Sequence, residues 1–326
     1  MRKDCGLPIA DCRLGRAVQQ LTGDARSVGG SDGCEQTLIA RSIGSRAAAA
    51  LRPGATGRVL ASFSRFCDLV TDKGDVVVLA WGGAEQGPLT VLFEPGPEGD
   101  LQSALATGAA FQVGMGELWL TRGSLQALRV DLSGAAHWDP RLHWEALQLR
   151  REQIRRSARI VSRVVTQAGG AGSGPRWQGR VSQATEAVLR AQRHRDQDEL
   201  RAAVQGLCGL GEGLTPQGDD WLAGWLLGLR LTGPMDASDW NPGPLGDMVL
   251  EVAVDRTTVL SRAFLTCAAA GEVAESWHLL LSYMARDCAD ERAVEGATRT
   301  ILAHGATSGA AMLEGFLAGL GPDRGS

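Results

Sequence analysis

The 326-residue sequence lacks the patterns of a membrane protein, a secreted protein or a nucleic-acid binder. No run approaches the ~20 apolar residues that cross a bilayer, and the opening MRKDCGLPIADCRLG has no continuous apolar stretch of a signal peptide. The formal net charge of −4 provides no general basic field of the kind that drives binding to nucleic acid. We therefore expect a cytoplasmic protein without membrane or nucleic-acid partners.

Cysteine is present, but it is not arranged as a disulfide framework or a metal site. The seven cysteines form no CxxC pair, are odd in number and are irregularly spaced, so reduced thiols are expected. None lies at a zinc-like spacing from a histidine, which argues against a structural metal. Aromatic residues are also scarce, whereas the 43 glycines exceed the average usage of about 7%. Some glycines are therefore expected in turns and where the backbone approaches a ligand.

The distribution of strand and helix patterns predicts an α+β fold. We expect residues 1–35 to form a flexible leader, residues 36–175 an N-terminal β-rich or α/β domain, and residues 176–326 a mostly helical domain. Strand-like segments occupy 59–71, 76–79, 89–93, 118–120 and 128–132, with turn residues between them. A long helical pattern begins at Pro140 and ends in the Gly/Ser/Pro stretch 168–175, which is interpreted as a loop or linker. Further helices are predicted at 182–194, 197–207, 219–231, 244–270 (with a possible interruption), 274–286, 290–302 and 308–319.

The strongest motif is GEGLTPQGDD at positions 211–220, which is followed by an apolar helical segment. Successive small residues leave backbone N–H groups free to converge on an anion, and a helix N-terminus adds its dipole. A plain helix start capped by an aspartate is the alternative. The residues expected to bind substrate here are Gly211, Gly213, Leu214, Thr215 and Gly218.

Asp219 and Asp220 end this motif and are candidate catalytic carboxylates. One of them can act as a general base or orient an amine nucleophile. Together with Glu212 they also have the oxygen chemistry that suits Mg²⁺. No other acidic ligand lies at a suggestive spacing, so no metal and no cofactor are expected.

A second motif, HGATSG at positions 304–309, falls between two predicted helices. His304 is the candidate for polarising a carbonyl or moving a proton. The neighbouring backbone and hydroxyl groups of Gly305, Thr307, Ser308 and Gly309 are expected to bind substrate, with Thr307 or Ser308 capping the next helix. A histidine at a helix C-terminus is the structural alternative.

A third motif, DRTTVLS at positions 255–261, places a guanidinium beside hydroxyl groups. Arg256 is suited to bidentate contact with a carboxylate or phosphate, with Thr257 and Thr258 as further donors. The alternative is an ordinary helix N-terminus or kink.

Together these motifs resemble the AllH (YlbF-like) family. The resemblance lies in G-x-G-L-T-P-x-G-D-D, R-T-T-x-x-S and H-G-x-T-S-G, roughly within 205–320. It implies similarity to the AllH subunit of oxamate carbamoyltransferase, which also requires AllF (FdrA-like) and AllG subunits. That enzyme interconverts oxalurate plus phosphate with oxamate plus carbamoyl phosphate. The chain departs from the family at Ala311, where Asp is frequent, and at Trp221, where Phe is common.

From the motifs and the resemblance we expect a carbamoyltransferase-like enzyme or enzyme subunit. Its substrate would be carbamoyl phosphate or a small carbamoylated carboxylic acid, held at the Gly-rich anion site. The alternatives are a non-catalytic ligand-binding or assembly subunit, and a lyase or hydrolase of a small dicarboxylate. The expected partners are a small anionic substrate and either copies of the same chain or other enzyme subunits.

Overall fold

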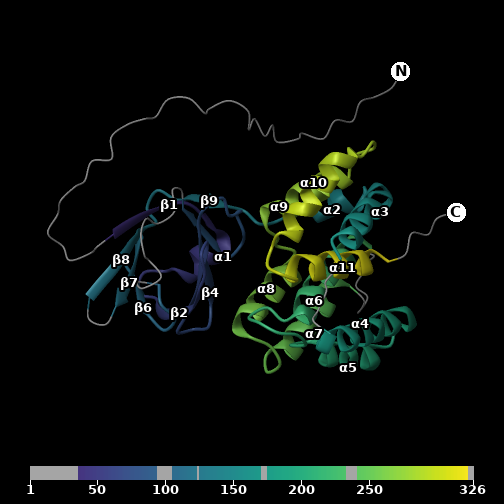
Figure 1. Cartoon of the computed structure of the whole chain (residues 1–326), viewed down its shortest axis with the longest axis horizontal. Coiled ribbons are helices and arrows are strands. Elements are labelled where there is room, and N and C mark those ends of the chain that lie inside the picture. Colours follow the sequence, from purple (N-terminus) through teal and green to yellow (C-terminus); the bar gives the residue numbers. More distant parts are fainter. Residues whose placement is uncertain (1–35, 94–104, 123–124, 170–174, 233–240, 322–326) are drawn as a thin grey trace, which may run out of the picture. The chain divides into compact units, whose positions relative to one another are not determined.

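A computed structural model describes residues 36–93, 105–122, 125–169, 175–232 and 241–321. The chain from Cys34 onward clusters as one compact unit. Strands fill its N-terminal part and helices its C-terminal part (Figure 1), so the predicted α+β class and its order are confirmed. The predicted leader lies outside the described residues, as does most of the predicted linker 168–175.

The strands form a closed, mixed eight-stranded barrel with a ninth strand attached. The barrel order is β5-β4-β3-β2-β6-β7-β8-β1, and β1 closes it by pairing antiparallel with β5. β1 also runs parallel to β8 and, in its second half, parallel to β9. The strands are β1 (Gln36–Gly44), β2 (Thr56–Ser62), β3 (Phe66–Thr71), β4 (Val76–Ala80), β5 (Thr90–Phe93), β6 (Ala110–Val113), β7 (Glu117–Arg122), β8 (Leu125–Asp131) and β9 (Ala136–Trp138).

The barrel interior is filled by alternate apolar side chains, as the two-residue period of a strand requires. Leu69, Leu79, Phe93 and Leu118 are among its fully buried members. The short helix α1 (Ser45–Ala50) adds two alanines to this core. β4 is covered on both faces, because Val76 and Val78 on its outer side pack in a second cluster with helix residues, and this explains its uninterrupted β-branched run.

Most helices lie where the sequence predicts them, but two long patterns are broken, and the helix predicted at 182–194 begins at Pro175, at the end of the predicted linker. The pattern after Pro140 contains two helices, since one ends at Gln148 and the next begins at Arg151. The expected interruption within 244–270 lies between Ala253 and Val259. The helices are α2 (Trp144–Gln148), α3 (Arg151–Gln167), α4 (Pro175–His194), α5 (Gln197–Leu207), α6 (Gln217–Thr232), α7 (Pro242–Ala253), α8 (Val259–Ala270), α9 (Glu275–Met284), α10 (Glu291–Leu302) and α11 (Ser308–Leu320). In the part of the chain described here, none of the helices has the length and hydropathy needed to cross a membrane.

Helices α6 and α11 are in backbone contact through reciprocal glycines. A Cβ atom at Gly224 would lie 1.9 Å from the carbonyl oxygen of Met312, and one at Gly315 would lie 2.0 Å from that of Trp221. Two further glycines repeat the contact one turn on: Gly228 and Gly319. Only glycine permits this approach, so the pair of helices has one relative position. The N-termini of this pair carry the last residues of both principal motifs, 217–220 in α6 and 308–309 in α11.

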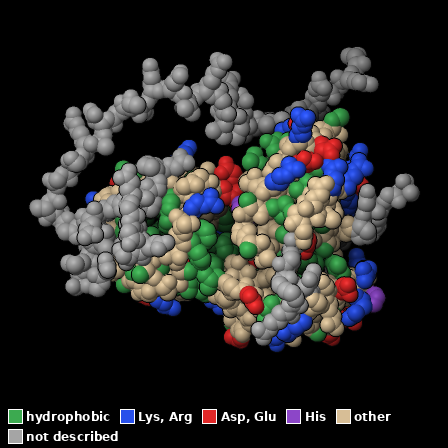
Figure 2. Space-filling view, in the orientation of Figure 1, with side chains coloured by type: hydrophobic (Ala, Val, Ile, Leu, Met, Phe, Trp, Pro, Cys, Tyr) green, Lys and Arg blue, Asp and Glu red, His purple; other side chains and the backbone are tan. Residues whose placement is uncertain are grey.

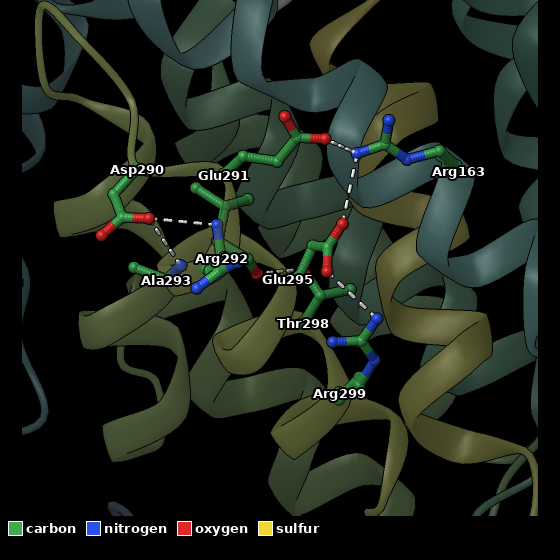
Figure 3. A network of polar contacts seen from close by, with 9 residues as sticks. Arg163, Asp290, Glu291, Arg292, Ala293, Glu295, Thr298 and Arg299 are labelled. Carbon is green, nitrogen blue, oxygen red and sulfur yellow. Dashed lines mark hydrogen bonds and ion pairs between the residues drawn. The ribbon is translucent and has the colours of Figure 1, made fainter.

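Helix α10 is attached to α3 by a network of charged side chains (Figure 3). Arg163 of α3 pairs with Glu291 and lies 3.3 Å from Glu295, which also accepts a hydrogen bond of 3.1 Å from Arg299. Asp290 caps the helix by accepting from two backbone N–H groups. Exposed pairs of this kind contribute little individually, but the network fixes the helix that ends just before His304. Elsewhere on the visible surface of the helical part, basic and acidic side chains intermix (Figure 2).

Candidate functional site

The loop before α6, residues 209–216, is built on glycines in left-handed conformations. Gly209, Gly211 and Gly213 have φ of 74°, 136° and 87°. The start of α6 presses against the end of α5, since a Cβ at Gly218 would lie 2.1 Å from the Leu207 carbonyl oxygen. The Gly218 N–H donates to Leu210, and the N–H of Asp219 donates to the Pro216 carbonyl. The first N–H groups of the helix are therefore used inside the protein.

The N–H groups available to a ligand lie earlier in the loop. Within the described ranges, no hydrogen-bond acceptor is found for the backbone N–H groups of Glu212, Gly213, Leu214 and Thr215. Glu212 and Gly213 are exposed, and the other two residues are partly buried. Backbone donors without a protein acceptor, in residues that are exposed or partly exposed, are the feature an anion site requires.

Asp219 holds the loop in place. It is almost fully buried, accepts a hydrogen bond from the Gly209 N–H at 2.9 Å and accepts a second from the Thr257 hydroxyl. Both carboxylate oxygens are thus engaged by the protein. Asp219 and Asp220 are adjacent in the first turn of α6, but they have different partners. Side chains of adjacent residues point about 100° apart around a helix axis, which predicts this difference.

The third motif supports the same loop from the start of α8. Thr258 caps α8 by accepting from the Ser261 N–H at 3.0 Å, and its hydroxyl donates to the Leu214 carbonyl. The Arg256 side chain is exposed and donates to the Gln205 carbonyl at 3.0 Å. The predicted hydroxyl donors of this motif therefore bind protein atoms, and the guanidinium lies against the end of α5.

Asp220 is the buried acid of the candidate site. Its side chain is 7% exposed, and its Oδ2 atom has no hydrogen-bond partner among the described residues. Burial raises the pKa of Asp220 to about 7; a hydrogen bond from Ser308 opposes this rise, and the charge of Asp219 adds to it. The carboxyl group therefore exchanges its proton near neutral pH.

Ser308 joins the first and second motifs. Its hydroxyl lies 3.1 Å from the hydroxyl of Thr215, and it also hydrogen-bonds to Asp220. The 304–309 turn that carries it is closed by a hydrogen bond of 3.0 Å from the Gly309 N–H to the His304 carbonyl. Thr307 occupies the N-cap position of α11, but its side chain makes no capping bond. The expected hydroxyl cap is absent there, and the Ser308 hydroxyl faces the Gly-rich loop instead.

His304 is paired with a barrel residue that the sequence interpretation missed. The Nε2 atom of His304 lies 2.9 Å from Oε1 of Glu85, in the loop between β4 and β5. The other Glu85 oxygen accepts from the Ser276 N–H at the start of α9, at 2.8 Å. Glu85 thereby fixes the orientation of the imidazole. Its only local signal was a single acid in a Gly-rich turn, and the pairing is remote in sequence.

A second barrel acid, Asp68, lies buried on β3. It is 3% exposed and stands opposite Val78 of β4, on the face that packs in a cluster with Leu214. Burial alone raises the pKa of Asp68 to about 6. The signal in the sequence was the one charged residue within the apolar strand FCDLVT.

In the described ranges, no three or more His, Cys, Asp and Glu side chains gather in a way that would hold a metal ion. Glu212, the third acid of the possible magnesium set, accepts a hydrogen bond of 2.8 Å from Trp177.

Comparison with known proteins gives a match in the helical, C-terminal part of the chain. The family model described as oxamate carbamoyltransferase subunit AllH matches residues 207–320, a segment that contains all three motifs. The chain matches no curated protein and no solved structure. The resemblance that the motifs predicted is therefore confirmed: residues 207–320 match the AllH family.

Proposed function

We propose that the chain is a carbamoyltransferase-like enzyme or enzyme subunit, with its site between the 209–216 loop and the 304–309 turn. The observation that carries the proposal is the polar chain from Asp220 through Ser308 to Thr215. It joins two motifs that are almost 90 residues apart and places a buried acid beside unpaired backbone donors. Both motifs lie in the segment that matches the AllH family.

The loop would bind the anionic part of the substrate. The N–H groups of residues 212–215 supply donors without positive side-chain charge, as in other backbone anion sites. The Arg256 guanidinium, which is exposed and next in the chain to the loop's anchor Thr257, would add charge after releasing Gln205. Carbamoyl phosphate and small carbamoylated carboxylic acids both carry such an anionic group.

Asp220 would act as the base in transfer. The nitrogen of an acceptor attacks the carbamoyl carbon, the bond from that carbon to the phosphate oxygen breaks, and phosphate leaves. The proton lost by the nitrogen passes to Asp220, whose pKa of about 7 suits a base at neutral pH. Asp219, with both oxygens occupied, orients the loop.

His304 and the turn would stabilise the oxyanion that forms on the carbamoyl group. The donors would be the imidazole held by Glu85, the Thr307 hydroxyl and, once it no longer donates to Asp220, the Ser308 hydroxyl. Stabilisation of developing charge and positioning of bound partners are the main contributions in such a transfer, and neither needs a cofactor.

A second candidate is a non-catalytic ligand-binding or assembly subunit. It is favoured by the family description, which names a subunit of a larger enzyme. Turnover of carbamoyl phosphate by the purified chain alone would exclude it, whereas activity only after adding co-purifying chains would support it.

A lyase or hydrolase of a small dicarboxylate would be recognised by turnover without a carbamoyl donor.

Calorimetric titration with carbamoyl phosphate tests the ligand site. Gly213→Val should abolish binding, because a β-branched residue is strained at φ of 87° and the loop must change shape. Gly108→Val is the matched control, since Gly108 has φ of 86° in a barrel turn and is equally unobstructed. Unchanged affinity in a folded Gly213→Val variant would show that the 209–216 loop does not bind the ligand and has a structural role.

A further inference from the structure

A cavity of about 760 Å³ lies beside the barrel, outside the candidate site. It is lined by α1 and the segment after it, by the β3–β4 turn and by the first eight residues of α8. Its volume falls in the range of small-molecule sites, about 300–1,000 Å³. Of the three motifs, only Val259 contributes to its wall.

Four cationic side chains line this cavity: Arg46, Arg52, Lys73 and Arg262. They outnumber the two carboxylates of the wall, and those carboxylates accept hydrogen bonds from threonine hydroxyls rather than from the cations. The wall therefore carries an excess of positive charge, although the chain as a whole is acidic.

The partners of these cations show which of them are free to bind a ligand. Arg46 pairs with Glu272, which does not line the cavity. Arg262 makes one long contact, 3.5 Å, to the Val254 carbonyl. The side chains of Arg52 and Lys73 make no ion pair or hydrogen bond within the described residues. Because the four cations exceed the two carboxylates of the wall, an anion bound there would reduce the remaining repulsion between like charges.

The first turn of α8 adds to the positive electrostatic potential of the cavity wall. Val259 opens this twelve-residue helix and lies in the cavity wall. The positive end of the helix dipole therefore lies at the wall, where it favours an anion. Val259 and Ala263 of this wall also belong to an apolar cluster that includes Leu214 of the 209–216 loop, but no residue of that loop lines the cavity.

We propose that this cavity binds a small organic anion with at least two negative charges, carried by phosphate or carboxylate groups. Arg52, Lys73 and Arg262 contact the anionic groups, and Arg46 is fixed by Glu272 at the edge of the site. The site is distinct from the 209–216 loop and does not depend on the function proposed for that loop.

Calorimetry with tripolyphosphate and with citrate, on the full chain at low ionic strength, tests this site. Lys73→Gln and Arg52→Gln should each weaken binding about tenfold, as expected for a lost hydrogen bond to a charged group. Arg193→Gln is the matched control, because Arg193 is exposed on α4, far from the cavity wall in sequence, and removes the same charge. Salt should weaken binding further.

The two probes distinguish the two ligand chemistries. Binding of tripolyphosphate alone indicates a phosphate ligand, and binding of citrate alone indicates a carboxylate ligand; either supports the site if the Lys73 and Arg52 variants lose affinity. Absence of binding by both probes overturns the proposal, as does equal loss in the Arg193→Gln control. Gly213→Val should leave probe binding intact, which separates this result from failure of the proposed transferase site.

Discussion

Replacing Asp220 by Asn tests the buried acid at the centre of the candidate site. The two side chains have the same shape, so the substitution removes the titrating group with little change in packing. Burial raises the pKa of Asp220 from 3.8 to about 7, which means that the folded protein binds this proton more tightly than the unfolded chain. Stability from this group is therefore highest at low pH and is lost as the pH rises from about 4 through 7.

The size of the effect follows from the difference between the two pKa values. A difference of about three pH units corresponds to roughly 4 kcal/mol, of which roughly 2–3 kcal/mol falls between pH 5 and pH 8. The amide that replaces the carboxyl group does not titrate. Wild type therefore loses roughly 2–3 kcal/mol of stability as the pH rises from 5 to 8, whereas Asp220→Asn does not. The free energy of unfolding of Asp220→Asn minus that of wild type should increase by the same roughly 2–3 kcal/mol.

Urea unfolding at pH 5, 6, 7 and 8 measures the change. The slope with pH is the quantity to compare, since an unpaired amide nitrogen in place of Oδ2 adds a cost that is the same at every pH. Asp247→Asn is the control, because Asp247 is exposed on α7 and loses one charge without removing a buried acid. Parallel stability curves for wild type and Asp220→Asn would refute the assignment of Asp220 as a neutral-range acid.

Three further results are expected. Gly224→Ala should lower the free energy of unfolding by about 1–3 kcal/mol in urea, because its Cβ would meet the Met312 carbonyl; Gly179→Ala, in open space on α4, should not destabilise, and equal stability of both variants would contradict the helix contact. His304→Ala should reduce turnover about a hundredfold in steady-state kinetics with little change in melting temperature, since a helix-terminal histidine contributes only about 0.3–1 kcal/mol. A variant with a much lower melting temperature and normal turnover would show that His304, with its partner Glu85, has a structural role. Activity should survive EDTA, and loss that Mg²⁺ restores would show that the acidic pair holds a metal.

Local patterns in the sequence were sufficient for most of the helices. The predicted helix 197–207 coincides with α5, whose cap Asp196 and amphipathic spacing are local features. The strand β1 was missed, because Ile39 is 68% exposed between the buried residues Leu38 and Ala40, so three apolar residues in a row hide the two-residue alternation of the strand. The strand β6, with four residues, is too short to show a period.

The candidate site was only partly predictable for a related reason. Ser308 and Thr215 were recognised in separate motifs, but their contact at 3.1 Å depends on how α6 and α11 pack. The partner of His304 comes from a barrel loop more than 200 residues away in the chain. A single sequence gives the chemistry of such residues, but their pairing depends on tertiary structure.

The closure of the barrel by β1 has a consequence for synthesis of the chain. β1 leaves the ribosome first among the strands, yet its partners β5, β8 and β9 follow later, the last ending at Trp138. At about 5–20 residues per second, the interval from Gly44 to the end of β8 at Asp131 is roughly 4–17 s. Until β8 has emerged, at least one edge of β1 is open to pairing with other chains. The nascent barrel is therefore exposed to misassembly until its eighth strand has emerged, and a chaperone that covers β1 should raise the yield of folded protein.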